Sequence, residues 1–476
     1  MLASHPTPPG PEGPASLRIL KKFAYLLSAR WTREGLQAIF LIYLARISSA
    51  SYAQFALALG LSSILLLVTE FGLNLPLVSL LGQKDRDQGT TLSQVTFLKG
   101  SLLILTLLGV LGFMAWQNYA LPLQQVMFAL CLGVGLDALA NSFFVALQVQ
   151  GRQDLQGKIK ALAAGLGFGY GLISLSLGAP PLAVACFKLI ESLVNLAGSA
   201  TLVLSRGQVR LRWPSWRRLG STLRLGPVFA GIEVAAIIYN KANLFFLQKY
   251  AGALGVAQYS VAWQTVDGVS ILVSSVLLQS ILFPLFVQFW EKDRARVTDL
   301  ARNTARWLLA AAVVVMFLLF IESDRIVTLV YGPQYPEAIW LQELLVLSVA
   351  FAFLHNLAAF LMISMRLQRL LLIFYLVGLA FNLSWCSLVI PRTPLLGAAL
   401  AMVLTKGGVA LLTVSFCQRR LGLIPGRAVL QLGGAVLLGA LLYLVGSGRL
   451  AREATEALAL APTLILAGRW WLTREK

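Results

Sequence analysis

Charged side chains that could bind an anion lie inside long apolar runs of this sequence. The first run, residues 23–45, contains Arg30, Arg33 and Glu34. Residues three or four positions apart share one face of an α-helix, so both guanidinium groups and the carboxylate are expected on a common face. A planar guanidinium can donate two parallel hydrogen bonds to a phosphate group. The spacing therefore predicts an anion-binding helix face.

The run that opens the second half of the chain is polar and charged in the same way. It contains Glu233, Asn240 and Lys241, and two later runs contain Asp267 and Lys406. Ammonium and amide groups can also hold a phosphate or an acidic sugar. The two lysines and Asn240 are therefore predicted, with the two arginines of the first run, to contact the substrate.

Membrane-spanning helices must position these groups. Of the 476 residues, 58% are hydrophobic and 12% are charged, and the mean hydropathy is +0.77. Soluble proteins have about 45–50% apolar and about 25% charged residues, which excludes a soluble enzyme or a nucleic-acid-binding domain. A bilayer-spanning helix needs about 20 apolar residues, and the sequence predicts an all-α polytopic membrane protein with about fourteen such helices. The predicted spans are residues 23–45, 52–82, 100–117, 123–148, 161–178, 181–204, 226–248, 256–288, 307–321, 338–362, 370–390, 394–417, 428–446 and 455–468, of which 307–321 and 455–468 are short.

The basic residues are distributed unevenly between the two predicted sides of the membrane. With the N-terminus placed in the cytoplasm, 28 of the 39 Lys and Arg fall in inner segments and 6 in outer segments. Because cytoplasmic loops carry the excess of Lys and Arg, both termini are predicted to be cytoplasmic. The net charge of +19 then reflects topology and attraction to anionic membrane lipids, and no nucleic-acid partner is expected.

The spans are expected to form two pseudo-symmetric six-helix bundles followed by two C-terminal helices. Ala53-Gln54-Phe55 in the second span is echoed by Ala257-Gln258-Tyr259 in the eighth, and a basic linker separates the sixth span from the seventh. Such internal repeats are common in transporters. The Pro- and Gly-rich start of the chain lacks the pattern of a cleaved signal peptide. The predicted divisions are a disordered cytoplasmic tail (1–19), an N-terminal bundle (20–204), a linker (205–225), a C-terminal bundle (226–417) and the last two helices with their tail (418–476).

Charges inside the spans need either water or a partner. Each Arg, Lys or Asp at the bilayer centre costs about 2.5–3.5 kcal/mol by insertion scales. In the first run, the alternative to a wet anion site is ion pairing, because Arg30 and Glu34 have the spacing of an in-helix pair. Arg33 would then need Asp137 or Asp267 from another helix. Both interpretations of the first run stay open at this point.

Other charged pairs have the same two interpretations. Lys188 and Glu191 are three residues apart and are expected to pair with each other. Lys406 and Asp267 lie in the middle of their spans, where they could line a cavity or pair between helices.

Carboxylates that can gain and lose a proton are candidates for ion coupling. Those predicted to act in this way are Glu34, Glu233 and Asp267. His355, next to Asn356, could relay protons or could be a histidine whose hydrogen bonds are satisfied within the bundle.

The sequence contains no pattern typical of a metal site, a cofactor site or a catalytic site. The four cysteines are widely separated and the two histidines form no cluster, so no metal and no cofactor is expected. No nucleotide-binding loop and no Ser-His-Asp arrangement is present, and the chain is not predicted to be an enzyme. Energy for transport would come from ion or substrate gradients.

At this point the chain resembles bacterial lipid-linked oligosaccharide flippases of the polysaccharide transport family, within the multidrug/oligosaccharidyl-lipid/polysaccharide exporter superfamily. The resemblance covers nearly the whole chain as a pattern of short, degenerate motifs. The residues that carry it are Arg33-Glu34-Gly35, Leu44-Ala45-Arg46, Tyr52-Ala53-Gln54-Phe55, Glu70-Phe71-Gly72-Leu73 and Tyr331-Gly332-Pro333-Gln334-Tyr335.

The resemblance implies alternating access around a cationic cavity, with a lipid-linked glycan as substrate. It implies that Arg30, Arg33 and Lys241 contact an undecaprenyl-type diphosphate or acidic sugars, and that the last two helices shape a groove for the polyprenyl tail. The protein would act in the bacterial cytoplasmic (inner) membrane, in the synthesis of a surface polysaccharide such as O-antigen, beside a glycan polymerase and other assembly proteins. A cation-coupled drug or metabolite exporter is the alternative, and a membrane-embedded glycosyltransferase or polymerase is a third hypothesis.

Overall fold

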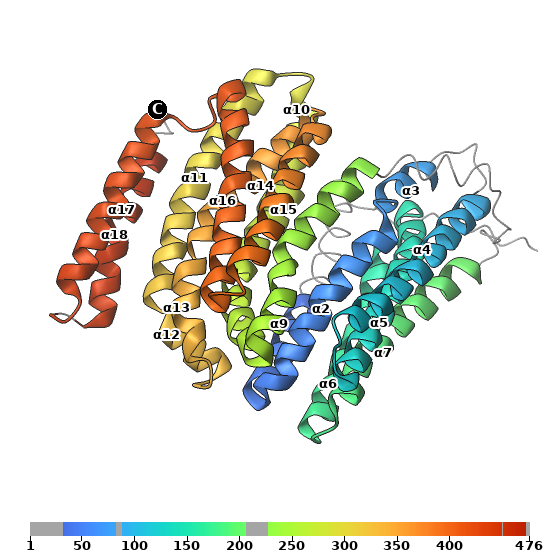
Figure 1. Cartoon of the computed structure of the whole chain (residues 1–476). Helices are drawn as coiled ribbons and strands as arrows, with labels where there is room; N and C mark the ends of the chain where they lie inside the picture. Colours follow the sequence, from blue (N-terminus) through green and yellow to red (C-terminus); the bar gives the residue numbers. More distant parts are fainter. Residues whose placement is uncertain (1–31, 82–87, 206–226, 450, 473–476) are drawn as a thin grey trace, which may run out of the picture. The chain divides into compact units, whose positions relative to one another are not determined.

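The computed structural model describes residues 32–81, 88–205, 227–449 and 451–472 (Figure 1). Every regular element in these ranges is a helix, which confirms the predicted all-α class. The predicted tail 1–19, Arg30 and nearly all of the predicted linker 205–225 lie outside the described residues.

The first half of the described chain consists of a helix over residues 32–47 and six further helices. These are α2 (Ser49–Glu70), α3 (Asn74–Leu81), α4 (Gln88–Trp116), α5 (Leu121–Val149), α6 (Gln153–Ser176) and α7 (Pro181–Leu204).

The second half begins with a long kinked helix and ends with a helical hairpin. Its elements are α9 (Pro227–Leu272), η1 (Val273–Leu282), α10 (Phe283–Trp290), α11 (Arg294–Ile321), α12 (Ser323–Ile326), η2 (Val327–Tyr331), α13 (Pro336–Leu345), α14 (Leu347–Ser364), α15 (Gln368–Val389), α16 (Pro394–Leu421), α17 (Gly426–Gly446) and α18 (Arg452–Leu472).

A helix is present at each of the fourteen predicted spans. Gly252 has φ 66° and ψ −167°, values that divide α9 into two arms at the boundary predicted between the seventh and eighth spans. By length and hydropathy, 11 helices among the described residues could cross a membrane. The two spans predicted to be short lie in longer helices, because α11 has 28 residues and α18 has 21.

Two predicted boundaries are wrong in a way that changes the chemistry. The second span was predicted over 52–82, although Glu70-Phe71-Gly72-Leu73 was also expected to close it. Phe71 and Gly72 have positive φ values (46° and 63°), so α2 ends there and the short α3 begins. The third span was expected to begin at residue 100, but α4 begins at Gln88 and includes Lys99, which is fully buried. Its amine donates hydrogen bonds to Asn74 Oδ1 (2.6 Å) and to the carbonyl of Ala138 (3.2 Å).

The expectation for the segment before the tenth span is only partly correct. Residues 322–337 lie between the ninth and tenth predicted spans, on the predicted outer side, and their Gly-Pro and Tyr-Pro steps predict turns, but α12 and η2 occupy most of this stretch. The turn is confined to the Gly-Pro and Tyr-Pro steps, where Gly332 has φ 106°.

Packing divides the described chain into two compact units. Residues up to 41 and from 65 to 205 belong to the first unit, and residues 42–64 and from 227 onward belong to the second. The end of the first helix and most of α2 therefore pack with the second half of the chain, although the sequence places them in the predicted N-terminal bundle.

Hydrogen bonds from the turn between η2 and α13 hold the end of the first helix in the second unit. Gln334 Nε2 and the Tyr335 hydroxyl donate to the carbonyl of Ala45 at 3.0 and 2.7 Å, and this carbonyl lies in the last turn of its helix. Gln258, in the repeated Ala-Gln-aromatic motif, accepts a hydrogen bond from the amide of Ala338 at 3.0 Å and donates to the carbonyl of Gln334 at 3.1 Å. The motifs Ala257-Gln258-Tyr259 and Gly332-Pro333-Gln334-Tyr335 are thus joined in one network.

Glycines allow α7 to pack closely against two helices of the first unit. A Cβ added at Gly133 of α5 would lie 3.1 Å from the Lys188 backbone, and one added at Gly167 of α6 would lie 2.9 Å from the Phe187 carbonyl. Small residues at helix contacts let backbones approach in membrane proteins. This approach brings Lys188 and Glu191 of α7 toward α5.

We predict that Gly167→Ala destabilises the first unit, because the new methyl group would meet Phe187 O and the Glu191 Cβ at 2.9 and 2.8 Å. Overpacking of this kind costs about 1–3 kcal/mol. The matched control is Gly165→Ala on the same helix, where an added Cβ has nothing within 4 Å. Thermal unfolding of the purified protein, followed by circular dichroism, should show a lower Tm for the Gly167 variant alone. Equal Tm values in the two variants would contradict this account of the helix contact.

Candidate functional site

The described charges inside the predicted spans gather mainly in two places, one in each unit. The first cluster consists of Arg33, Asp137, Lys188, Glu191 and Asn195. Lys188 Nζ lies 2.7 Å from Glu191 Oε2 and also forms an ion pair with Asp137. Arg33 Nε lies 2.6 Å from Glu191 Oε1, and Asn195 Nδ2 donates to Asp137 Oδ1 at 3.0 Å.

The first cluster is electrically balanced. Its two basic groups face two carboxylates, and the side chains of Lys188 and Glu191 are 3% and 1% exposed. A buried ion pair is tolerated when both charges are matched and hydrogen-bonded. The predicted Lys188–Glu191 pair is confirmed, and Asp137 is an additional partner of Lys188.

Glu191 of α7, which was not among the predicted candidates, is the direct partner of Arg33. Asp137, one of the two candidates, lies within electrostatic range of Arg33 in the same cluster. The sequence had assigned Glu191 to Lys188 alone, but a carboxylate has two oxygens and here each oxygen accepts from a different base. Arg33 is still 32% exposed, and Glu34 lies 3.8 Å from its Nη1 with half of its side chain exposed.

The second cluster surrounds a cavity of about 220 Å³ in the second unit. Its lining includes three residues predicted from sequence, Asn240, Asp267 and Lys406. They come from α9 and α16, which pack against each other, while η1, α14 and α15 complete the wall. The polar groups that had been separate predictions therefore share one site.

Lys406 has two partners in this cluster. Its Nζ lies 3.3 Å from Asp267 Oδ1 and 4.2 Å from the centre of the Trp263 ring. Both the carboxylate and the face of an indole ring attract an ammonium group. Interhelical pairing and cavity lining had been alternatives for Lys406 and Asp267, and in the structure both hold.

Lys241 is a charged residue of the second unit that has no direct partner among the described residues. It lies within electrostatic range of Asp267 and Lys406 but makes no hydrogen bond or ion pair with the described residues. It is half-buried, and its Cβ and Cδ pass beside Gly60 of α2. Two ammonium groups thus share one carboxylate, which leaves one positive charge in excess. A half-buried charge of this kind favours water or an anionic ligand as its partner.

The cavity also holds a histidine and an amide. His355 Nε2 lies 2.7 Å from the Tyr375 hydroxyl and Nδ1 lies 3.1 Å from Thr413 Oγ1, so both ring nitrogens have partners. Asn240 Nδ2 donates to the carbonyl of Ala236 at 2.8 Å, whereas its buried Oδ1 has no hydrogen-bond partner in the structure. An orphaned amide oxygen beside a cavity indicates room for a donor such as a sugar hydroxyl or water.

Glu233, like Lys241, is a predicted site residue of α9 that is not among the described lining residues of this cavity. It is exposed and does not belong to the described lining. It lies eight residues before Lys241 on α9. Its predicted role in ion coupling stays a prediction.

Lys99 is the buried cation that the sequence analysis missed. A short apolar run seemed to begin after it, so it was counted as an inner-loop residue. The polar residue Asn74, directly after the Phe71-Gly72-Leu73 break, was the available signal, because it supplies the oxygen that binds the amine. Within the described residues, no group of three or more His, Cys, Asp or Glu side chains could hold a metal ion.

Comparison with solved structures identifies the architecture. The lipid II flippase MurJ in an inward closed conformation matches with a TM-score of 0.74 and 11% identity, over 95% of this chain and 99% of that one. An inward-facing multidrug resistance MATE family transporter of the MOP superfamily matches with a TM-score of 0.66 and 15% identity, over 82% and 94%. A MOP superfamily transporter from Pyrococcus furiosus matches with a TM-score of 0.58 and 13% identity, over 85% and 95%.

The fold is therefore that of the multidrug/oligosaccharidyl-lipid/polysaccharide exporter superfamily, and the chain is a multi-pass membrane protein of this class. The sequence profile of the family described as "Polysaccharide biosynthesis protein" matches residues 19–290, more than half of the chain. The protein belongs to that family, and the resemblance predicted from the sequence is confirmed. No curated protein matches the sequence.

We predict that Lys188→Met strongly destabilises the protein, because it leaves Asp137 and Glu191 buried with Arg33 as their only base in the cluster. Removing one partner of a buried ion pair typically costs about 3–5 kcal/mol. Glu34→Gln is the control, since a half-exposed carboxylate contributes about 0–1 kcal/mol. Thermal unfolding of the purified proteins in detergent should give a much lower Tm for Lys188→Met than for Glu34→Gln. Similar Tm values would show that the cluster is hydrated and contributes little.

Proposed function

We propose that this protein is a flippase for a lipid-linked oligosaccharide of the undecaprenyl-diphosphate type. It would move this substrate across the bacterial cytoplasmic membrane by alternating access, for the synthesis of a cell-surface polysaccharide such as O-antigen. Family membership and the exporter fold support the class of transporter. Membrane lipids and a glycan polymerase are the expected partners, and both termini are expected in the cytoplasm.

The observation that carries this proposal is the excess positive charge at the second cluster. Lys406 pairs with Asp267 in the lining of a polar cavity, and Lys241, which is not among the described lining residues, lies within electrostatic range of both. Diphosphate is an anion of matching sign, and an ammonium group binds it as a compact point charge. Asn240, with its unpartnered oxygen, would receive a sugar hydroxyl or a bridging water.

Charge balance at the second cluster also provides a coupling mechanism. When a phosphate draws Lys406 away, Asp267 loses its ion-pair partner and must take up a proton or another cation. Binding of the anion and uptake of the cation would then favour each other, as linked equilibria require. We propose Asp267 as the main coupling carboxylate, with Glu34 and Glu233 as further candidates.

The arginines of the first span are proposed to bind the headgroup at another stage of the cycle. Arg33 has its Nε bonded to Glu191, but its guanidinium carries further donors and is 32% exposed. Arg30 is proposed as its neighbour on the same helix face. A guanidinium already fixed by a carboxylate is oriented before the phosphate arrives, which lowers the entropy cost of binding.

A cation-coupled drug exporter is the second candidate function. An unpartnered ammonium group at Lys241 opposes it, because a cationic drug near the second cluster would be repelled. A glycosyltransferase or polymerase activity is not favoured, because the family and fold are those of transporters. We therefore propose transport without catalysis, driven by ion or substrate gradients.

We predict that Lys241→Ala reduces flipping about tenfold or more, since a charge-assisted contact of roughly 1.5–3 kcal/mol would be lost. Lys249→Ala is the matched control, because this lysine is exposed and contacts only the Tyr250 ring. Surface glycan and lipid-linked precursor should be measured in cells with equal amounts of each variant. Precursor should accumulate inside only in the Lys241 variant. Normal glycan export in that variant would remove the proposed role of the second cluster.

A double variant, Arg30→Ala with Arg33→Ala, tests the first span. We predict loss of surface glycan and accumulation of precursor, with the protein still present in the membrane. Ile39→Ala, at an exposed position of the same helix and outside the proposed machinery, is the control in the same background strain. If polymer length changed while flipping persisted, the enzyme hypothesis would be favoured and the proposed headgroup contact of Arg30 and Arg33 would be contradicted.

A further inference from the structure

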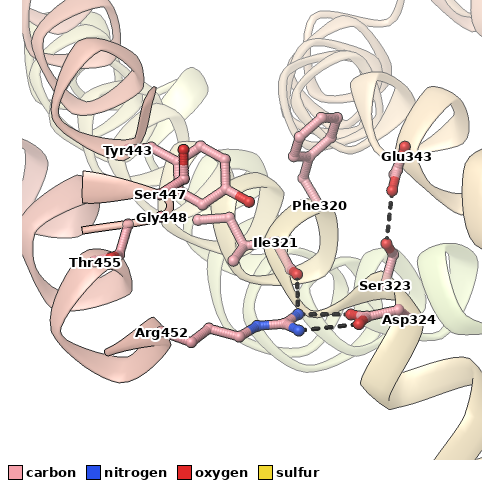
Figure 2. Close-up of a pocket in the computed structure, with 10 residues that line it drawn as sticks. All are labelled: Phe320, Ile321, Ser323, Asp324, Glu343, Tyr443, Ser447, Gly448, Arg452 and Thr455. Carbon is pink, nitrogen blue, oxygen red and sulfur yellow. Dashed lines mark hydrogen bonds and ion pairs between the residues drawn. The ribbon is translucent and has the colours of Figure 1, made fainter. Parts of the chain in front are cut away.

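A second polar pocket, of about 360 Å³, lies between the α17–α18 hairpin and the ends of α11, α12 and α13 (Figure 2). Segments 322–337 and 447–454 are predicted to lie on the outer side of the membrane. The pocket is separate from the second cluster, and the two share none of their described lining residues. Pockets of about 300 Å³ or more can hold a small ligand.

Arg452, the first residue of α18, closes one side of this pocket (Figure 2). Its Nη1 and Nη2 donate to the two carboxylate oxygens of Asp324 at 2.9 and 2.5 Å, and Nη2 also donates to the carbonyl of Ile321. Its Nε lies 2.9 Å from Glu322 Oε1. A bidentate guanidinium–carboxylate contact fixes both orientation and distance. The hairpin is therefore anchored to the bundle at this pocket.

The lining combines aromatic rings with hydroxyl groups and a carboxylate. Phe320 and Tyr443 supply the rings, Ser323 and Ser447 supply hydroxyls, and Glu343 lies behind Ser323. Glu343 accepts one hydrogen bond from Ser323 Oγ at 2.9 Å, and a carboxylate can accept several more. Sugars present an apolar face of C–H groups and a rim of hydroxyls, so rings and acceptors in one pocket match their chemistry.

The charge around the pocket excludes a phosphate as its preferred ligand. The bases near the pocket are Arg325, Arg452, Arg449 beside the lining residue Gly448, and Arg46, which lines a neighbouring pocket with Asp324. They are outnumbered by the carboxylates Glu322, Asp324, Glu343, Glu453 and Glu456. Hydrogen bonds from Arg452 lower the pKa of Asp324 to about 2, so this carboxylate stays ionised near neutral pH. A neutral or amino sugar fits this field, whereas a diphosphate does not.

The hairpin also offers an apolar surface next to the pocket. Leu437, Leu441 and Leu444 of α17 are 73%, 57% and 70% exposed, and Ser447 of the pocket follows within one turn of Leu444. In a membrane, such a surface contacts lipid tails. One lipid-linked sugar could therefore place its tail along α17 and its sugar at the pocket.

We propose that this pocket is a sugar-binding subsite for the glycan portion of the substrate on the outer side, which rests on the proposed flippase function. Tyr443 and Phe320 contact the apolar face of a sugar ring. Glu343 and Ser447 bond its hydroxyl groups. Arg452 keeps the hairpin in place, since three of its N–H donors are bonded to Asp324 and Ile321 and its charge is paired with Asp324 and Glu322.

Saturation-transfer NMR on the full chain in lipid nanodiscs tests this subsite. The probes are N-acetylglucosamine, glucosamine and glucose 1-phosphate at equal concentrations. N-acetylglucosamine and glucosamine should give saturation-transfer signals with the parent protein. These signals should fall about two- to tenfold in Tyr443→Leu and in Glu343→Gln, as expected for loss of one ring contact or one hydrogen bond. Tyr443→Phe keeps the ring and should retain most of the signal. Tyr250→Leu is the matched control, because Tyr250 is an exposed tyrosine of α9 outside the pocket.

Signals that are equal in all these variants would overturn the subsite, and so would a glucose 1-phosphate signal stronger than that of the uncharged sugar. A flipping assay with the same proteins separates this result from the proposed function. Flipping by the parent protein without sugar signals would refute the subsite and leave the flippase intact. Sugar signals that depend on Tyr443 and Glu343, in a parent protein that does not flip, would refute the flippase and keep the sugar pocket. Unchanged Tm values in the variants exclude misfolding as the cause.

Discussion

Compensation of buried charge is the constraint on which this structure depends. A membrane bundle tolerates a basic side chain only with a carboxylate, a ring face or water beside it. In the first unit, close approach of α7 at Gly133 and Gly167 brings Lys188 and Glu191 toward Asp137. Helix packing and electrostatics are linked there, because a small shift of α7 would leave Asp137 and Arg33 without their partners on this helix.

The two units satisfy this constraint to different degrees. The first cluster matches each base with a carboxylate, which is typical of a structural element that must hold its shape. The second cluster places Lys241 and Lys406 near Asp267 alone, next to a cavity and to the unpartnered amide oxygen of Asn240. Incomplete compensation is costly for stability and useful for binding, because the ligand supplies the missing charge. We therefore place the main substrate contact of the proposed flippase at the second cluster.

The sequence predicted the class of fold well and the details of pairing less well. Apolar runs located a helix at each predicted span, since an apolar run follows from the cost of polar groups in lipid. The Lys188–Glu191 pair was predictable because it is local to one helix. The Arg33–Glu191 contact joins residues 158 positions apart, and Lys99 is buried by the α3 break. The pocket beside Arg452 likewise depends on how the hairpin docks. The Arg33–Glu191 contact, the burial of Lys99 and this pocket all depend on tertiary packing. The periodicity of the sequence carries no information about such packing.

The most direct test of the central claim is the reactivity of Lys241→Cys toward an anionic thiol reagent, 2-sulfonatoethyl methanethiosulfonate. The background rate is measured with the parent protein and with a Cys186→Ala derivative of it. The other three cysteines, Cys131, Cys386 and Cys417, are buried. A water-filled anion site predicts that the new thiol reacts well above background, and that an undecaprenyl-diphosphate lipid slows the reaction. A thiol that reacts no faster than background, or one that the diphosphate lipid fails to protect, would contradict the claim that an uncompensated lysine binds the headgroup.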